Sequence, residues 1–120
     1  MLADARNNKF GDVLNDLEYE DIDINAFDND GRTVLQYASI YNKDAIIIKA
    51  LDNFDVNINS LDNYGKGSLH YAPKPRNSRC TETLLTHQDI KINIQDHHSK
   101  ISLHYSVTKN DHEHVNMILL

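Results

Sequence analysis

Apolar residues return along this chain in pairs of short clusters separated by polar segments. The stretch 33–40 becomes apolar at helical spacing directly after the turn formers of 28–32, where Gly31 can take a positive φ, and a second cluster follows at 46–51. This spacing predicts two short helices, each with one buried face. Thr33 is placed to cap the first helix. Both helices are shorter than the roughly 12–15 residues needed for marginal stability alone, so neighbours must hold them.

This cycle repeats with a period of 34 residues, and the matching positions include acidic, apolar, aromatic and amide residues. They are Asp28, Asp62 and Asp96; Leu35, Leu69 and Leu103; Tyr37, Tyr71 and Tyr105; and Asn25, Asn59 and Asn93. We interpret the asparagines as side-chain amides that bond turn backbone. Such periodicity indicates tandem copies of one unit that buries its apolar face by stacking. We expect a single domain over 1–120, with units at approximately 1–27 (partial), 28–61, 62–95 and 96–120 (partial).

The middle unit contains an irregularity in its first helix. Pro73 and Pro75 fall where that helix would continue. A proline inside a helix removes a hydrogen bond and clashes with the preceding turn, which costs about 3 kcal/mol, so the helix is expected to stop near Ala72. The loop 73–79 that follows is either a tolerated defect or a rigid basic loop that presents its cations to an acidic partner or a phosphate.

The repeated residues resemble the T-P-L-H-x-A signature of ankyrin repeats. Residues 69–72 (Leu-His-Tyr-Ala) and 103–106 (Leu-His-Tyr-Ser) are similar to its L-H-x-A part, and 23–28 resembles the family's D-V-N-A-x-D turn. The resemblance covers essentially the whole chain. It implies an all-α ankyrin-repeat solenoid of stacked helix-turn-helix units with protruding turns. The signature is altered at several positions. Its proline is replaced by Val34, Ser68 and Ser102, its histidine by Gln36, and its threonine by Gly67 and Ile101.

No catalytic or metal-binding set can be separated from the repeat. The resemblance implies that His70 and His104 form hydrogen bonds with turn backbone. The other histidine clusters, His97-His98 and 112–114, lack the i, i+4 spacing that is common among metal ligands on helices. The acids are periodic turn residues or scattered charges, without a nucleophile and base to match. Cys80 occupies an apolar slot and is expected to be a packed thiol. We therefore predict no enzymatic activity, no catalytic or metal-binding residues and no cofactor.

Composition adds expectations about compartment and partner class. Twelve Lys and Arg against eighteen Asp and Glu give a net charge of −6, which argues against nucleic acid as a partner, and the absence of a long apolar run argues against a membrane. The single cysteine fits a reducing compartment, so we predict an intracellular protein, cytoplasmic or nuclear. Because the last helix ends on Leu119-Leu120 without a polar cap, we expect either a longer protein or self-association through an open C-terminal end.

The resemblance implies that partners contact the turn tips and the inner face of the first helices. These positions, which we expect to be free of structural roles, hold six of the twelve basic residues and one acidic residue. The predicted partner-binding residues are Arg6, Phe27, Arg32, Tyr41, Tyr64, Lys66, Lys74, His97, His98, Lys100 and Lys109. We predict that this basic concave surface, with its aromatic anchors, binds an acidic protein segment. The alternatives are single-stranded nucleic acid in the same groove and a structural spacer within a multidomain protein.

Overall fold

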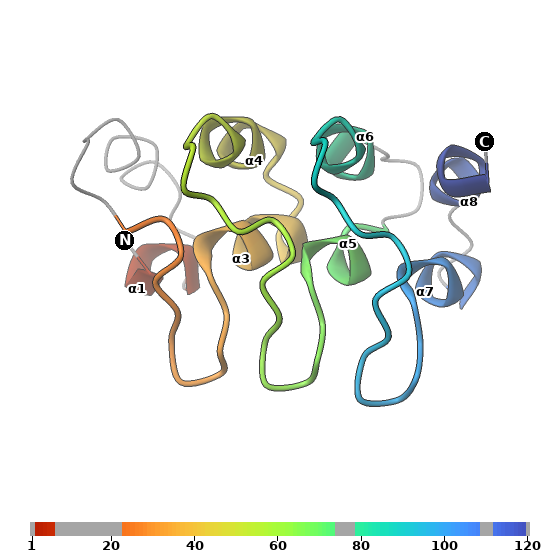
Figure 1. Ribbon diagram of the computed structural model, residues 1–120, viewed down its shortest axis with the longest axis horizontal. Helices are drawn as coiled ribbons and strands as arrows, with labels where there is room; N and C mark the ends of the chain where they lie inside the picture. Colours follow the sequence, from red (N-terminus) through yellow and green to blue (C-terminus); the bar gives the residue numbers. More distant parts are fainter. Residues whose placement is uncertain (1, 7–22, 74–78, 109–111, 120) are drawn as a thin grey trace.

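The computed structural model is an elongated row of helix pairs with long loops projecting to one side (Figure 1). It describes residues 2–6, 23–73, 79–108 and 112–119. Their helices are α1 (Leu2–Arg6), α3 (Val34–Ile40), α4 (Asp44–Leu51), α5 (Ser68–Tyr71), α6 (Arg79–Leu85), α7 (Ser102–Thr108) and α8 (His112–Leu119). These described residues contain no strand. The expected all-α class is confirmed.

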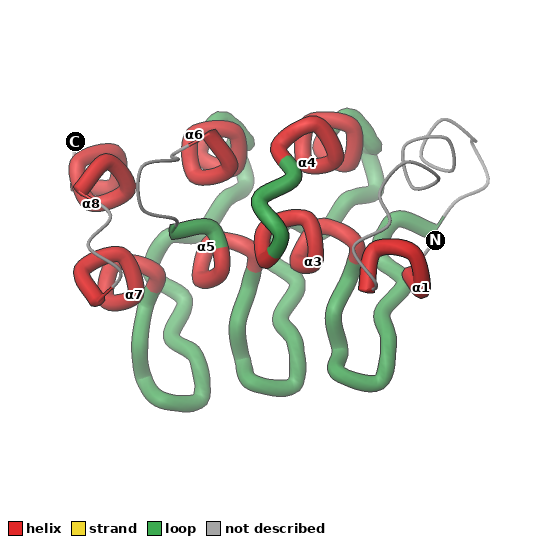
Figure 2. Tube along the Cα trace, turned by 180° about the vertical axis from the view of Figure 1, so that it is seen from behind, coloured by secondary structure: helices red, strands yellow, loops and turns green. Residues whose placement is uncertain are grey.

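The helices form two rows, with the projecting loops on the outer side of the first row. Helices α1, α3, α5 and α7 make up the first row, and α4, α6 and α8 make up the second (Figure 1). Each first-row helix contacts the next one along the row, and α3, α5 and α7 also contact the second-row helix that follows them in sequence. Viewed from behind, the loops extend from the first row away from the second (Figure 2). Contacts therefore run between neighbouring units, as in other repeat proteins.

Helices α3, α5 and α7 each begin with a side chain of the first turn that accepts the backbone N–H of the residue before the helix. Thr33 caps α3 as the sequence predicts, and the Oε1 atom of Gln36 accepts the N–H of Thr33 at 2.7 Å, which completes a capping box. In α5 the Nδ1 atom of His70 accepts the N–H of Gly67 at 3.0 Å, and His104 makes the equivalent bond in α7. The prediction that both histidines bond turn backbone is confirmed.

Helix α5 is only one turn long, and its end agrees with the sequence prediction. Its last residue is Tyr71, and Ala72 is the C-terminal cap. Pro73 follows, and its ring lacks the N–H that would continue the helix. Residues 74–78 lie outside the described part of the chain, so the interpretation of this loop as a basic binding element stays a prediction.

The core lies between the two helix rows and extends under the loops. Its largest contributors are the buried residues Ile24, Val34, Leu35, Ile46, Ile47, Ile58, Leu69 and Leu84. Full burial of one such aliphatic side chain contributes about 1.5–3 kcal/mol, so this core is a major source of stability. Cys80 is completely buried, and its thiol lies 3.1 Å from the Oδ1 atom of Asn42, as expected for a packed cysteine. Among the described residues, every helix is too short or too polar to cross a bilayer.

Candidate interaction surface

Three projecting segments, 26–33, 60–67 and 94–101, share one internal structure, and we call them the hairpin loops. Each is organised around an aspartate. In the second hairpin loop, the Oδ1 atom of Asp62 accepts the N–H groups of Tyr64 and Lys66 at 2.9 and 3.0 Å, while the N–H of Asp62 donates to the carbonyl of Lys66 at 2.9 Å. Asp28 and Asp96 make the same bonds in their own loops. The loops therefore have a common, internally bonded shape.

The second carboxylate oxygen of each aspartate accepts a hydrogen bond from a tyrosine of the following helix. The pairs are Tyr37 with Asp28, Tyr71 with Asp62, and Tyr105 with Asp96. Burial and the bonded carboxylate raise the pKa of Tyr37 and of Tyr105 to about 12. Burial also raises the pKa of Asp96, but bonds from the Tyr105 hydroxyl and from the N–H groups of Lys100 and His98 outweigh it and lower this pKa to about 2.

These shifts predict a loss of stability at both ends of the pH scale. The ordinary pKa of Asp96 is 3.8, so its contribution is complete above about pH 4 and is lost as the pH falls toward 2. The contribution of Tyr105 is complete below pH 10 and is lost as the pH rises toward 12. Urea unfolding at a series of pH values measures the free energy of unfolding at each pH. We expect this free energy to fall less steeply on the acid side in Asp96→Asn than in the wild type. An equally steep fall in both proteins would contradict this prediction.

The basic residues of the hairpin loops alternate with the same tyrosine rings, and we call this set the cation–tyrosine stack. In order along the molecule it contains Tyr37, Arg32, Tyr71, Lys66, Tyr105 and Lys100. The Cζ atom of Arg32 lies 5.8 and 5.4 Å from the ring centres of Tyr37 and Tyr71. The Nζ atom of Lys66 lies 5.4 and 4.6 Å from those of Tyr71 and Tyr105. Each such contact is worth about 0.5–1 kcal/mol at an exposed site, so the tyrosine rings help to orient the three cations.

Arg32 has a structural role in addition to its place in the stack. Its Nε atom pairs with the Oδ2 atom of Asp62 at 3.3 Å, and its Nη2 atom donates to the Tyr71 hydroxyl at 3.2 Å. Its guanidinium also lies 5.6 Å from the ring centre of Tyr64. The expectation that the partner-facing positions have no structural role is therefore wrong for Arg32. The 34-residue period of the sequence does not reveal that Asp62 and Tyr71 of the next unit lie close enough to bond Arg32.

Adjacent hairpin loops touch each other backbone to backbone. The N–H of Asn63 donates to the carbonyl of Asp30 at 2.9 Å, and the N–H of His97 donates to that of Tyr64 at 3.0 Å. Gly65 has a φ of 74°, and a Cβ atom there would lie 3.0 Å from the His97 nitrogen and 2.6 Å from its ring. A glycine therefore permits the close approach, and His97, predicted to contact a partner, lies against the neighbouring loop.

Polar side chains of the first-row helices bond the hairpin loop of the next unit. The Nε2 atom of Gln36 donates to the carbonyls of Ser60 and Lys66 at 2.8 and 3.1 Å. The Nε2 atom of His70 lies 3.1 Å from the carbonyl of Lys100. Because its Nδ1 atom accepts a backbone N–H, the His70 ring carries its proton on Nε2. Gln36 and His70 therefore make equivalent contacts despite their different chemistry.

Two of the repeated asparagines, Asn25 and Asn59, bond backbone as predicted, and they do so across units. The Nδ2 atom of Asn25 donates to the carbonyl of Asp55 at 2.7 Å, and its Oδ1 atom accepts the N–H of Asn57 at 2.8 Å. Asn59 joins the second unit to the third with the same pair of bonds. The sequence predicted bonding to a turn, but not that the turn belongs to the next unit.

The predicted partner-binding residues do not share one environment. Phe27 and Tyr64 are 70% and 50% exposed, and His98 and Lys100 are also exposed. Tyr41 is partly engaged, because its hydroxyl donates to the carbonyl of Arg6 at 3.2 Å. Lys74 and Lys109 lie outside the described residues. The stack thus brings together Arg32, Lys66, Lys100 and, through Arg32, Tyr64.

The pairing of aspartate with tyrosine is the feature that sequence reasoning missed. In each of the last three units the tyrosine follows the aspartate by nine residues, and both are repeated positions of the sequence. Their constant separation could have suggested a contact between them. The hydrogen bonds from Arg32 to Asp62 and Tyr71 could not be predicted from such a spacing, because they depend on the distance between neighbouring units.

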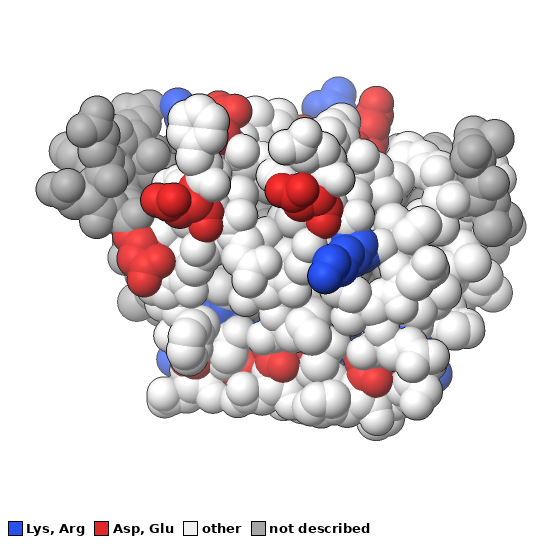
Figure 3. Space-filling view, in the orientation of Figure 1, with Lys and Arg blue, Asp and Glu red and all other residues white. Residues whose placement is uncertain are grey.

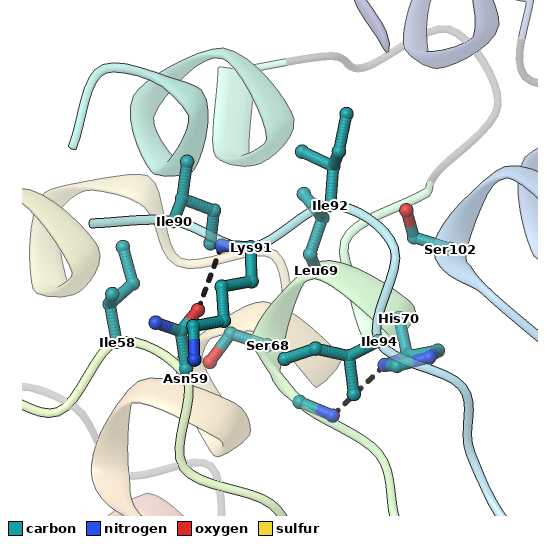
Figure 4. Close-up of a pocket in the computed structure, with 11 residues that line it drawn as sticks. Ile58, Asn59, Ser68, Leu69, His70, Ile90, Lys91, Ile92, Ile94 and Ser102 are labelled. Carbon is teal, nitrogen blue, oxygen red and sulfur yellow. Dashed lines mark hydrogen bonds between the residues drawn. The ribbon is translucent and has the colours of Figure 1, made fainter. Parts of the chain in front are cut away.

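A small pocket between the second and third units is formed mainly by core residues. Its apolar lining includes Ile58, Leu69, Ile90 and Ile92, as Figure 4 shows. Ser102 also lines it, and its Oγ atom is the buried side-chain polar atom that lacks a partner within the described residues. In the same part of the chain, no group of three or more His, Cys, Asp and Glu residues is placed to hold a metal ion. We interpret this pocket as a packing defect between units.

Acidic side chains also lie away from the stack. In Figure 3 they are visible over the loops that follow α4 and α6, with a basic group beside the second of these loops, and further acidic groups lie over the hairpin loops at the lower edge. Asp52, Asp55 and Asp89 are exposed in the segments after α4 and α6, and so is Lys91. These segments follow the second-row helices, whereas the cation–tyrosine stack belongs to the hairpin loops and the first row.

Comparison with known protein families agrees with this architecture. A family model described as ankyrin repeats (3 copies) matches residues 1–96 of the 120. The chain therefore belongs to the ankyrin-repeat family, and the resemblance seen in its sequence is confirmed. Members of this family are generally protein–protein interaction modules and are typically non-catalytic. No curated protein matches the chain.

Proposed function

We propose that this ankyrin-repeat chain binds an acidic segment of another protein on the surface formed by the cation–tyrosine stack and the exposed residues of its hairpin loops. The cation–tyrosine stack is the observation that carries the proposal. Its balancing carboxylates are largely withdrawn from solvent, since Asp62 and Asp96 are 5% exposed and are bonded by tyrosine and backbone donors. Lys66 is partly exposed and Lys100 is exposed. The surface thus presents cations while the matching anions lie beneath it.

Exposed aromatic and apolar side chains beside the stack supply anchors for a partner. Tyr64 is half exposed and packs against the Arg32 guanidinium. Phe27 and Leu61 are 70% and 43% exposed, and they occupy the same position in adjacent hairpin loops. Aromatic side chains contribute much of the energy at protein interfaces, so the fitting partner carries apolar or aromatic residues among its acids.

The basic residues of the stack have different roles in partner binding. Lys66 and Lys100 are held by tyrosine rings and provide the charges that attract carboxylates. Arg32 already pairs with Asp62, so it supports the neighbouring hairpin loop and orients Tyr64. Charge reversal at Arg32 would disturb the fold as well as binding. The test therefore uses the two lysines.

The probe is a fluorescently labelled random copolymer of glutamate and tyrosine, whose binding is followed by anisotropy at low and raised salt. We expect the double variant Lys66→Glu/Lys100→Glu to bind it at least about tenfold more weakly, which corresponds to about 1.4 kcal/mol, and with a weaker salt dependence. Lys91→Glu is the matched control, because Lys91 is exposed but lies outside the stack. Circular dichroism verifies that each variant is folded.

Unchanged affinity in the folded double variant would overturn the proposal. Polyglutamate without tyrosine is expected to bind more weakly than the copolymer, because it lacks the anchors. Single-stranded oligothymidine tests the nucleic-acid alternative, and tighter binding of the oligonucleotide than of the copolymer at low salt would replace the proposal. Binding of none of the three would favour a structural spacer.

A further inference from the structure

The second and third units are joined through the imidazole ring of His70. Its Nδ1 atom accepts the N–H of Gly67 at 3.0 Å, and its Nε2 atom donates to the carbonyl of Lys100, 3.1 Å away in the third hairpin loop. Beside this bridge, the N–H of His97 donates to the carbonyl of Tyr64 at 3.0 Å. We call these three hydrogen bonds the histidine joint.

The corresponding contact between the first and second units, here called the glutamine joint, contains an amide in place of the imidazole. Gln36 accepts the N–H of Thr33 and donates to the carbonyl of Lys66. The N–H of Asn63 donates to the carbonyl of Asp30. A glutamine side chain does not titrate, whereas an imidazole takes up a proton at about pH 6.5. The two joints therefore share their geometry, and one of them contains a group that can change its charge.

Proton uptake by His70 is incompatible with the closed histidine joint. One ring nitrogen serves as an acceptor and the other as a donor, which only the neutral ring with its proton on Nε2 can provide. In the imidazolium both nitrogens are donors, so Nδ1 would point its proton at the N–H of Gly67. The ring is 4% exposed, so bulk water does not reach it to replace the lost acceptor. The protonated ring therefore favours an open joint.

The aromatic and acidic groups that face the ring have partners of their own. The ring of Tyr105 meets that of His70 edge to face, with the centres 6.0 Å apart. The Asp96 carboxylate attracts a positive ring through space, but it already accepts the Tyr105 hydroxyl and two backbone N–H groups of its own loop. Tyr71, next to His70 in α5, bonds the aspartate of its own loop. Among the described residues, the hydrogen bonds of the His70 ring go to backbone and none goes to a carboxylate.

Three lysines around the joint oppose a further positive charge. Lys91 lines the same pocket as His70 (Figure 4). The ammonium groups of Lys66 and Lys100 lie 4.6 and 5.8 Å from the centre of the Tyr105 ring that meets the imidazole. The titratable side chains of α3 and α6, which also pack against α5, are exposed or have partners elsewhere; they are Tyr37, Arg79, Cys80 and Glu82.

We propose that the histidine joint is a pH-sensitive contact that opens in mildly acidic solution, while the glutamine joint stays closed. The contribution of the joint to stability is complete above about pH 7.5 and is lost as the pH falls through about 6.5. The contact between Lys66 and the Tyr105 ring crosses this joint, so opening divides the cation–tyrosine stack. The inference concerns the fold itself and does not depend on which partner the chain binds.

Amide hydrogen exchange followed by NMR tests the proposal, with each rate corrected for the intrinsic pH dependence of exchange. The N–H of His97 reports on the histidine joint, and the N–H of Asn63 reports on the glutamine joint. Between pH 7.5 and 5.5 we expect the protection of His97 to fall about tenfold, because an imidazole that titrates only in the open joint adds a factor of ten for each pH unit below about 6.5. The protection of Asn63 is expected to stay constant.

The two joints provide reciprocal variants. His70→Gln is expected to remove the pH dependence at His97, and Gln36→His is expected to transfer a fall of about tenfold to Asn63. His104→Gln is the matched control, because His104 makes the same bond at the start of its helix with an exposed ring, and we expect it to leave the fall at His97 unchanged.

Three results would overturn the proposal. The first is a fall at His97 that persists in the folded His70→Gln variant, and the second is an equal fall at His97 and Asn63 in the wild type. The third comes from the nitrogen chemical shifts of the imidazole, which report its protonation directly. A His70 ring that is protonated at pH 5.5 while the N–H of His97 keeps its protection would show that the charged ring fits the closed joint.

Discussion

Replacement of Gly65 by alanine is expected to lower the free energy of unfolding by about 2–4 kcal/mol. Two causes combine. The φ of 74° is unfavourable for any residue with a Cβ atom. The added methyl would also lie 2.6 Å from the His97 ring and 3.0 Å from its backbone nitrogen, so the second and third hairpin loops must separate.

Gly67→Ala is the matched control, because it adds the same methyl two residues away. Gly67 has a φ of −101°, and a Cβ atom there would meet Leu61 and Ser60 at ordinary contact distances of 3.5 and 3.6 Å. We expect a change of less than about 1 kcal/mol, set by its weaker helix-capping ability. Urea unfolding monitored by circular dichroism compares the two variants. Equal destabilisation by both would contradict the role assigned to the loop-to-loop contact.

Replacement of His70 by alanine is expected to lower the free energy of unfolding by about 2–4 kcal/mol. The ring is 4% exposed, accepts the N–H of Gly67 and reaches the carbonyl of Lys100. Its removal leaves two backbone groups without their side-chain partner and leaves a cavity between units. The third hairpin loop also loses one of its bonds to α5, so amide hydrogen exchange within 96–101 is expected to accelerate.

The chain itself supplies the conservative control for this variant. Gln36 occupies the equivalent position, closes its own capping box and bonds the carbonyls of Ser60 and Lys66. We therefore expect His70→Gln to retain most of the stability, within about 1 kcal/mol of the wild type. A glutamine variant as unstable as the alanine variant would show that the imidazole shape, rather than the pair of hydrogen bonds, is what the site requires.

The architecture could be predicted from the sequence because many positions of different chemical class repeat with the same period of 34 residues. Thr33, Ala72 and Cys80 each lie where local chemistry places them, as a helix cap, a helix end and a packed thiol. These outcomes depend on capping preference, on the effect of proline and on apolar periodicity. All three act within one unit, so a single sequence contains the necessary information.

The candidate site was less predictable because its geometry lies between units. The sequence identified Lys66 and Lys100 as basic positions, but it did not show that both lie against tyrosine rings. It also treated Arg32 as a free surface residue, although the ion pair with Asp62 fixes it. Distances between units depend on the stacking of the hairpin loops, and the period alone does not contain them.

The surface that a partner occupies can be mapped residue by residue by NMR. The glutamate–tyrosine copolymer is added to isotopically labelled protein, and the amide signals that broaden or shift are assigned to residues. If partners bind at the cation–tyrosine stack, these signals cluster at Phe27, at 61–66 and at 97–100, and the response weakens in Lys66→Glu/Lys100→Glu. Changes centred instead on the acidic loops after α4 and α6, with the hairpin loops unaffected, would contradict it.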